Sequence, residues 1–142
     1  MGNIDTLSSH VPEFAQLRAA DIMERDVRSA HPHTKGDVVG SLMIEGFGGV
    51  PIVDKNQQLV GMVTEFDLLA SLDGGKKLGD LEAKEIMTPE VVRISPQTDM
   101  STLIYVLQTN HLIRVPVVDR EGKLIGIVAR RDVVRGFLSA AS

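Results

Sequence analysis

Cysteine and tryptophan are absent from this sequence, and its 142 residues include only one tyrosine and four phenylalanines. A chain without cysteine has no disulfide and no thiol nucleophile, which agrees with a reducing compartment such as the cytoplasm. So few aromatic side chains leave little surface on which nucleic-acid bases could stack. The net charge of −4 further argues against binding through neutralised phosphates. We therefore expect a cytoplasmic protein that does not bind nucleic acid.

Long hydrophobic runs are missing as well. No apolar stretch approaches the roughly eighteen residues of a membrane-spanning helix. The N-terminus also lacks the charged region and apolar core that are typical of a secretory signal. Hydrophobic residues make up 43% of the chain and charged residues 24%, as in an ordinary soluble globular protein. We expect no membrane association.

The main feature that is present is a pattern that occurs twice. It consists of a β-branched run with a proline, a polar turn, a second apolar run with a glycine, and an aspartate six residues after that glycine. The two copies are 50–67 and 115–132. Pro51 and Pro116 are 65 residues apart (116 − 51), and so are Gly61 and Gly126 (126 − 61). A match kept in register over this length indicates an internal repeat.

Each copy predicts a two-strand hairpin, because two apolar runs flank a turn rich in Asp, Asn or Gly. A further short strand precedes each hairpin and ends at Pro32 or Pro96, since proline cannot donate to a sheet. Between that strand and the hairpin, the apolar spacing predicts a helix over 35–45 and over 100–109. Another helix follows each hairpin, so each repeat has the order β-α-β-β-α. The fold class is therefore α/β (α+β).

Several residues are predicted to begin or end these helices. Thr34 is the expected N-cap of the first helix, and Thr98 or Asp99 that of its counterpart. The glycine-rich stretch 46–49 is best explained as a C-cap and a tight turn into the strand. The last helix is expected to run to about Leu138, and the tail after it to fray.

The predicted organisation is an arm and short helix over 1–19, a first repeat over 20–70, a linker over 71–83, a second repeat over 84–138 and a tail over 139–142. Ile22-Met23 near the start of the first repeat is matched by Ile86-Met87 in the second. A repeat of roughly sixty residues would bury only a marginal core by itself. We therefore expect the repeats to pack on each other.

Thr64 and Asp67 stand where a strand meets a helix, and this position has two interpretations. The helix N-terminus presents unpaired N–H groups and favours anions, so oxygen-bearing side chains beside it belong in many binding sites. The alternative is that both residues simply cap the helix, which such residues commonly do. Either interpretation fits the residues.

The doubled order of elements, with Ile-Met at the start, Pro-Val-Val-Asp before the hairpin and Gly-Ile-Val after it, resembles the cystathionine-β-synthase (CBS) domain. Two in tandem resemble the CBS pair, or Bateman module, over residues 20–138. The resemblance implies two repeats packed sheet to sheet about a pseudo-twofold axis, and a dimer of such pairs. It also implies two clefts that bind adenosine-containing ligands, namely AMP, ADP, ATP or S-adenosylmethionine.

The resemblance also implies which residues line each cleft. The family motif Gly-h-h-Thr/Ser-x-x-Asp matches 61–67 fully, whereas Ala129 replaces the hydroxyl residue in the second copy. An ionised aspartate accepts from both ribose hydroxyls at once. The main cleft is expected to combine Thr64, Asp67, Val91, Val92, Arg93, Arg114, Pro116 and Arg131. The second, poorer cleft is expected to combine Val27, Arg28, Ser29, Gly49, Pro51 and Asp132.

Three functions remain open at this point. The first is a non-catalytic sensor of adenosine-containing ligands that signals to a protein target of unknown identity. The second is a dimerisation scaffold with empty clefts, and the third is a nucleotide-processing enzyme. The sequence shows no catalytic triad, P-loop or metal cluster, and we predict no catalytic residue and no required cofactor. His31 and His33 have a spacing that some metal sites use, but no further ligand at suitable spacing, so we predict no metal site.

Overall fold

The structure is a computed structural model that describes residues 13–141, apart from the side chains of 46, 47 and 141. Residues 1–12 of the expected arm and short helix lie outside the described residues. The chain divides into two compact units. The central unit comprises 26–92 and 118–124, and the terminal unit comprises the described residues up to 25, 93–117, and those from 125 onward.

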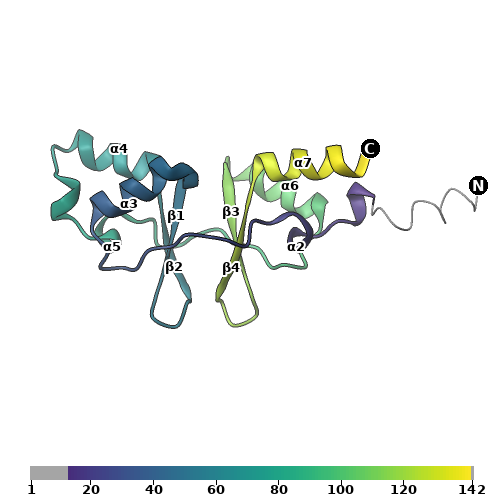
Figure 1. Ribbon diagram of the computed structural model, residues 1–142, viewed down its shortest axis with the longest axis horizontal. Coiled ribbons are helices and arrows are strands. Elements are labelled where there is room, and N and C mark those ends of the chain that lie inside the picture. The colour runs from purple at the N-terminus through teal and green to yellow at the C-terminus, as the bar shows by residue number, and fades with distance from the viewer. Residues whose placement is uncertain (1–12, 142) are drawn as a thin grey trace, which may run out of the picture. The chain divides into compact units, whose positions relative to one another are not determined.

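The central unit is an antiparallel hairpin covered by helices (Figure 1). Strand β1 (Gly49–Val53) pairs with β2 (Leu59–Thr64), and Val50 lies opposite Val63 in the register. The helical elements are α3 (Gly36–Leu42), a π-helical turn (Met43–Phe47), α4 (Glu65–Asp73), a 3-10 turn (Leu78–Asp80) and α5 (Ala83–Ile86). The predicted hairpin of the first repeat is thus confirmed. α5 precedes the second hairpin in the sequence but packs in the central unit.

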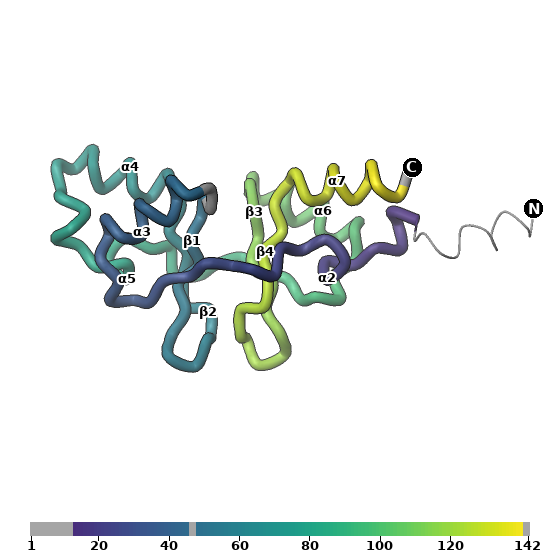
Figure 2. Tube along the Cα trace, viewed as in Figure 1, coloured from purple at the N-terminus to yellow at the C-terminus, as the bar shows by residue number. Residues whose placement is uncertain are grey.

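The terminal unit repeats this plan (Figure 2). Its hairpin is formed by β3 (Arg114–Val118) and β4 (Leu124–Ala129), apart from the tip 118–124, which belongs to the central unit. Its helices are α6 (Met100–Thr109) and α7 (Arg130–Ala141). A 3-10 turn (Phe14–Gln16) and α2 (Ala19–Ile22) contact α7. The chain therefore has the mixed helix and strand composition that the sequence predicts.

We call the segment with α2 and the segment with α5 the lead-in segments, because each precedes one repeat in the sequence. Each of them packs with the hairpin of the other repeat. The segment with α2 precedes the first repeat in the sequence, yet it packs in the terminal unit with the second hairpin. The segment with α5 precedes the second repeat and packs in the central unit with the first hairpin. The compact units thus cut across the predicted boundaries 20–70 and 84–138, which follow the repeat along the sequence.

Glycine in the second strand of each hairpin makes this packing possible. A Cβ at Gly61 would overlap the Met87 sulfur and lie 2.9 Å from Met87 Cγ. A Cβ at Gly126 would lie 2.5 Å from Met23 Sδ and 3.0 Å from Met23 Cγ. The repeated Ile-Met and the repeated glycine are therefore two halves of one contact, which occurs once in each unit.

Each unit has its own hydrophobic core. In the terminal unit Leu103 and Val115 have no exposed surface, and in the central unit the same is true of Val39 and Ile52. Val39 and Leu103 from the first helices of the two repeats lie in these cores, whereas Val38 is 49% exposed. Met43 and Met100 are buried in these cores.

Local details differ from the sequence-based expectations. The strand expected before Pro32 is a single bridge between Ala30 and Ile52, because the proline stops the ladder after one residue. The Thr34 hydroxyl accepts from the His31 backbone N–H and does not cap α3, so that expectation was wrong. The last helix does not end near Leu138 but continues to Ala141.

Other expectations about helix ends are confirmed. The Asp99 carboxylate accepts from the Thr102 backbone N–H at 2.8 Å and is the N-cap of α6. Gly48 follows the π-helical turn with a φ of 38°, in the left-handed region that a C-cap glycine supplies. The glycine-rich stretch is therefore a helix end.

Candidate functional site

The candidate site begins at the first turn of α4, where Thr64 and Asp67 form a reciprocal cap. The Thr64 backbone N–H donates to Asp67 Oδ2 at 2.8 Å, and the Thr64 hydroxyl donates to the same oxygen at 3.0 Å. In return Thr64 Oγ1 accepts from the Asp67 backbone N–H at 3.3 Å. Both residues are partly buried. The capping interpretation of these residues is therefore confirmed.

The second oxygen of Asp67 faces a residue from the lead-in segment. The Thr88 hydroxyl lies 3.4 Å from Asp67 Oδ1, and Thr88 also forms a backbone bridge with Met62. Three hydroxyl or carboxylate groups thus gather at the start of α4. Sequence reasoning missed Thr88, which reaches Asp67 from a segment 21 residues away along the chain.

In the second repeat, Asp132 at the start of α7 has different hydrogen-bond and ion-pair partners from those of Asp67. The Ala129 backbone N–H donates to Asp132 Oδ2 at 2.7 Å, so the aspartate still caps its helix. The other oxygen, Oδ1, lies 3.5 Å from Nη1 of Arg135 one turn along α7. The Asp132 side chain is 12% exposed. Its carboxylate is therefore engaged by a cation of its own helix, and sequence reasoning did not identify that cation.

The remaining predicted residues of the main cleft belong to both units. Val91 is half-buried and Val92 exposed in the central unit. The other four lie in the terminal unit: Arg93 and Arg131 are exposed, Arg114 is half-buried at the start of β3, and Pro116 is buried within it. The prediction that these residues line one site with Asp67 stays a prediction.

The residues predicted for the second cleft lie in the central unit, apart from Asp132. Val27 and Ser29 are half-buried, and Gly49 and Pro51 are buried in β1. Arg28 is exposed and forms an ion pair with Glu45 at 3.1 Å. Their assignment to a ligand site likewise stays a prediction.

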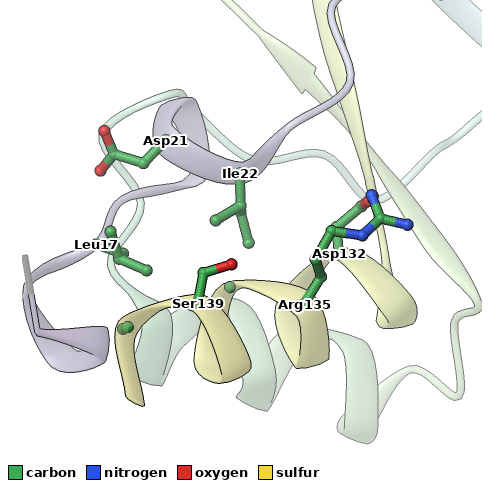
Figure 3. A pocket seen from close by; sticks show the side chains of 8 residues that line it. Leu17, Asp21, Ile22, Asp132, Arg135 and Ser139 are labelled. Atoms are coloured by element: carbon green, nitrogen blue, oxygen red, sulfur yellow. The ribbon is translucent and has the colours of Figure 1, made fainter. Parts of the chain in front are cut away.

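A cavity of about 290 Å³ lies in the terminal unit between α7 and the segment that carries α2 (Figure 3). Ile22 points toward α7 and Ser139, whereas the Asp21 carboxylate turns away from the helix. That carboxylate accepts from the Arg18 backbone N–H at 2.7 Å. Asp132 and Arg135 line one end of the cavity. Both acids in the cavity wall, Asp21 and Asp132, are engaged as helix caps, as Asp67 is at the start of α4.

The two histidines with metal-like spacing have other partners. His31 Nδ1 lies 3.0 Å from the Val53 carbonyl oxygen, and His33 Nδ1 lies 3.2 Å from Glu82 Oε1. The hydrogen bond with His33 lowers the pKa of Glu82 below its usual value. Among residues 13–141, no three His, Cys, Asp or Glu side chains are grouped so that they would hold a metal ion.

Comparison with known proteins identifies the family. The model of the CBS domain matches the chain twice, over residues 19–74 and 83–139. The chain belongs to the CBS-domain family. The tandem CBS pair that the sequence resembles is therefore present, and the positions of the two matches agree with the repeat.

Curated relatives match through part of their length. The chain is 30% identical over 122 residues to inosine-5′-monophosphate dehydrogenase of Methanocaldococcus jannaschii, and the match covers 85% of this chain but 24% of that enzyme. It is 30% identical over 148 residues to CBSX1, a chloroplastic CBS-domain protein of Arabidopsis thaliana, and covers 81% of this chain and 61% of that protein. The chain thus spans about a quarter of the dehydrogenase and about three fifths of the plant protein.

Solved structures of CBS pairs have the same fold. A structure of CBSX2 in complex with AMP has a TM-score of 0.79 at 30% identity, covering 89% of this chain and 99% of that one. CBSX2 is a protein of Arabidopsis thaliana. The CBS domain pair of protein MJ0100, in complex with 5′-methylthioadenosine and S-adenosylmethionine, has a TM-score of 0.76 at 27% identity and covers 84% of this chain and 94% of that one.

Within the described part of this chain, none of the helices is long and apolar enough to cross a membrane.

Proposed function

We propose that this protein is a non-catalytic sensor that binds an adenosine-containing ligand, AMP, ADP, ATP or S-adenosylmethionine, and signals to a partner protein. The observation that supports it most directly is that similar CBS pairs bind AMP, or 5′-methylthioadenosine and S-adenosylmethionine. The proposal includes a homodimer and a cytoplasmic location. The location rests on composition alone, and a plant relative is chloroplastic.

In this proposal Asp67 holds the ribose. Its carboxylate oxygens are within 3.4 Å of hydroxyl or N–H donors, which shows that both oxygens present lone pairs to donors at the surface of the unit. Ribose hydroxyls would take the place of the Thr64 and Thr88 hydroxyls, while the backbone N–H bond would remain. A hydrogen bond to a charged group is worth about 1.5 to 3 kcal/mol. Losing the carboxylate should therefore weaken binding by about tenfold or more.

The phosphate side of the ligand needs cations from elsewhere. The first turn of α4 carries Glu65 and Asp67 and no basic residue. The predicted main cleft supplies Arg93, Arg114 and Arg131, and a planar guanidinium suits a phosphate. A ligand without phosphate, such as S-adenosylmethionine, would not need these arginines. If replacing these arginines lowers the affinity, the ligand contains phosphate. If the affinity is unchanged, the ligand has no phosphate.

The second site is proposed to be the weaker one. Asp132 shares its carboxylate with Arg135, and Ala129 offers no hydroxyl. A ribose would have to displace the arginine before it reached Oδ1. The proposed protein is therefore asymmetric, with its main site at Asp67.

Calorimetric titration of nucleotide-free protein with AMP, ATP and S-adenosylmethionine tests the proposal. We expect saturable binding that Asp67→Ala weakens about tenfold or more and Asp132→Ala changes little. Asp99→Ala is the matched control, because it also removes a helix cap but lies outside both predicted clefts. If folded wild-type protein gives no heat with any of these ligands, the sensor proposal fails.

A scaffold with empty clefts is the second candidate, because the cap at Thr64 and Asp67 explains both residues without a ligand. Under that alternative Asp67→Ala would cost only a helix cap, about 1 kcal/mol of stability. Binding would then be absent in every variant. The titration and a urea denaturation of the same variants decide between the two.

A further inference from the structure

Thr88 is held against β2, the strand that leads into α4. Its backbone N–H donates to the Met62 carbonyl oxygen at 2.9 Å, and its own carbonyl oxygen accepts from the Met62 N–H at 3.0 Å. Pro89 follows directly, and a proline restricts the residue before it to extended backbone. The backbone of Thr88 is therefore fixed beside Met62, two residues before Thr64 in the sequence, while Thr88 remains exposed.

The Thr88 hydroxyl reaches the Asp67 oxygen that does not take part in the helix cap. Asp67 Oδ2 accepts from the Thr64 N–H at 2.8 Å and from the Thr64 hydroxyl at 3.0 Å, whereas the Thr88 hydroxyl donates to Oδ1 at 3.4 Å. A distance of 3.4 Å is longer than an ordinary O–H···O bond, so this contact is weak. All three residues belong to the central unit. A ligand hydroxyl that came to Oδ1 would therefore displace only a weak bond.

A ribose hydroxyl can use both groups together, because a hydroxyl both donates and accepts hydrogen bonds. Its proton would be donated to Asp67 Oδ1, and its oxygen would accept from the Thr88 hydroxyl that this proton displaces. A deoxyribose has only hydrogen at that carbon, so it would leave both groups without this bond. A site that hydrogen-bonds a ligand hydroxyl rejects the analogue without it, because its own polar groups are then left unpaired.

We propose that Thr88 is a specificity-determining residue of the site at Asp67, where it selects an adenosine-containing ligand with ribose over one with deoxyribose. The inference rests on the proposed function, to which it adds the group that recognises one ribose hydroxyl. Thr88 supplies the donor and Asp67 the acceptor, so the pair recognises a hydroxyl in particular. An ether or carbonyl oxygen cannot donate and would leave Asp67 Oδ1 unpaired.

The second repeat has a different residue in the same place. Glu24 forms two backbone hydrogen bonds with Ile127, at 2.9 and 3.0 Å, as Thr88 does with Met62. Thr88 and Glu24 are 64 residues apart (88 − 24), the offset of the Ile-Met that precedes each of them. An ionised carboxylate only accepts hydrogen bonds, so Glu24 would not supply the donor. This position therefore adds to the asymmetry between the two proposed sites.

A cycle that combines changes in the protein with changes in the ligand tests the inference. Calorimetry would give the dissociation constants of wild type and Thr88→Val for AMP and 5′-methylthioadenosine, and for the 2′-deoxy and 3′-deoxy forms of each. We expect Thr88→Val to weaken binding of the parent ligand about threefold to tenfold, the size of one hydrogen bond. For the deoxy form that lacks the recognised hydroxyl, the same change should alter the affinity by less than about twofold. The other deoxy form should show the full loss.

Further variants separate recognition of the ligand from a structural role. Thr88→Ser keeps the hydroxyl and should bind within about twofold of wild type, with the same preference for ribose. Ser71→Ala is the matched control, since the Ser71 hydroxyl donates to the Asp67 backbone carbonyl oxygen at 3.3 Å and not to the carboxylate. It should leave the preference for ribose unchanged. Thr88→Glu, which copies the residue of the second repeat, should bind less tightly than Thr88→Val because it adds a negative charge beside Asp67.

Three results would overturn the inference. If Thr88→Val weakens binding of the parent ligand and of both deoxy forms equally, the Thr88 hydroxyl does not recognise the ribose. If Thr88→Val, folded by circular dichroism, binds every ligand as wild type does, the hydroxyl has no role in binding. The third result is a folded wild type that gives no heat with AMP or 5′-methylthioadenosine.

These results also separate this inference from the sensor proposal. Heat with AMP or 5′-methylthioadenosine, without coupling between Thr88 and one ribose hydroxyl, contradicts the role of Thr88 and leaves the sensor proposal standing. The sensor proposal fails as well only if ATP and S-adenosylmethionine also give no heat.

Discussion

The contact between Gly61 and Met87 yields a sharp prediction for stability. In Gly61→Ala the new Cβ would overlap the Met87 sulfur and lie 2.9 Å from Met87 Cγ and 3.1 Å from the Thr88 carbonyl oxygen. Overpacking of this kind costs about 1 to 3 kcal/mol. Replacing a glycine inside a strand returns about 0.5 to 1 kcal/mol of backbone entropy. Taking the middle of each range, we expect a net loss of about 1.2 kcal/mol.

Urea denaturation followed by circular dichroism measures this loss. With a slope of about 2 kcal/mol per molar urea, the midpoint should fall by about 0.5 to 1 M. Gly40→Ala is the matched control, since its Cβ would lie 3.7 Å from Leu68 Cδ1 and meet only ordinary contact. Within helix α3 that change should stabilise the protein by up to about 1 kcal/mol.

A double-mutant cycle with Met87→Ala identifies the cause. If the methionine is what Gly61 makes room for, Gly61→Ala should cost less in the Met87→Ala background than in the wild type. An equal cost in both backgrounds, or a Gly61→Ala protein as stable as the wild type, would refute the reasoning. The same cycle at Gly126 and Met23 should give a similar result, because the contact is repeated there.

Two other predictions concern α6. Leu103→Ala should destabilise the protein by about 2 to 5 kcal/mol because Leu103 is fully buried, whereas Tyr105→Ala on the exposed face should stay within about 0.5 kcal/mol; thermal melting compares them. Hydrogen bonds from the Thr102 side chain and backbone lower the pKa of Asp99, so its contribution to stability is present above the unfolded pKa and is lost as pH falls through the folded one. The stability difference between wild type and Asp99→Asn should therefore shrink as pH is lowered toward 3.8 and below, and an unchanged difference in denaturation curves would contradict this.

Local signals in the sequence were sufficient to predict the two hairpins and the helices beside them. Apolar runs with β-branched residues on either side of a polar turn predicted both hairpins. Thr98 or Asp99 was predicted to cap the apolar helix that follows, and Asp99 is the residue that does so. Thr34 failed as a cap because the turn before α3 uses its hydroxyl for the His31 backbone N–H. A side chain with two possible backbone partners cannot be assigned from its position alone.

The exchange of lead-in segments was beyond the reach of the sequence. Met23 and Met87 occupy the same place in the repeat, and so do Gly61 and Gly126, so either methionine fits either glycine by type. Only the path of the chain decides which pair meets. The same limit applied to the candidate site: the contact of Thr64 with Asp67 is local and was foreseen as a cap, but Thr88 reaches Asp67 from a distant segment and was missed.

Cutting the chain between its repeats would divide both cores at once. A nick after Gly75 would leave Ala83, Ile86 and Met87 on one fragment and the hairpin they cover on the other. The first fragment would likewise keep Ala19 and Met23, which belong with the second hairpin. Neither half is therefore a module that can be expressed alone with an intact interior. The two repeats therefore depend on each other as parts of one folding unit. Either repeat by itself would expose the apolar residues that a segment of the other repeat covers.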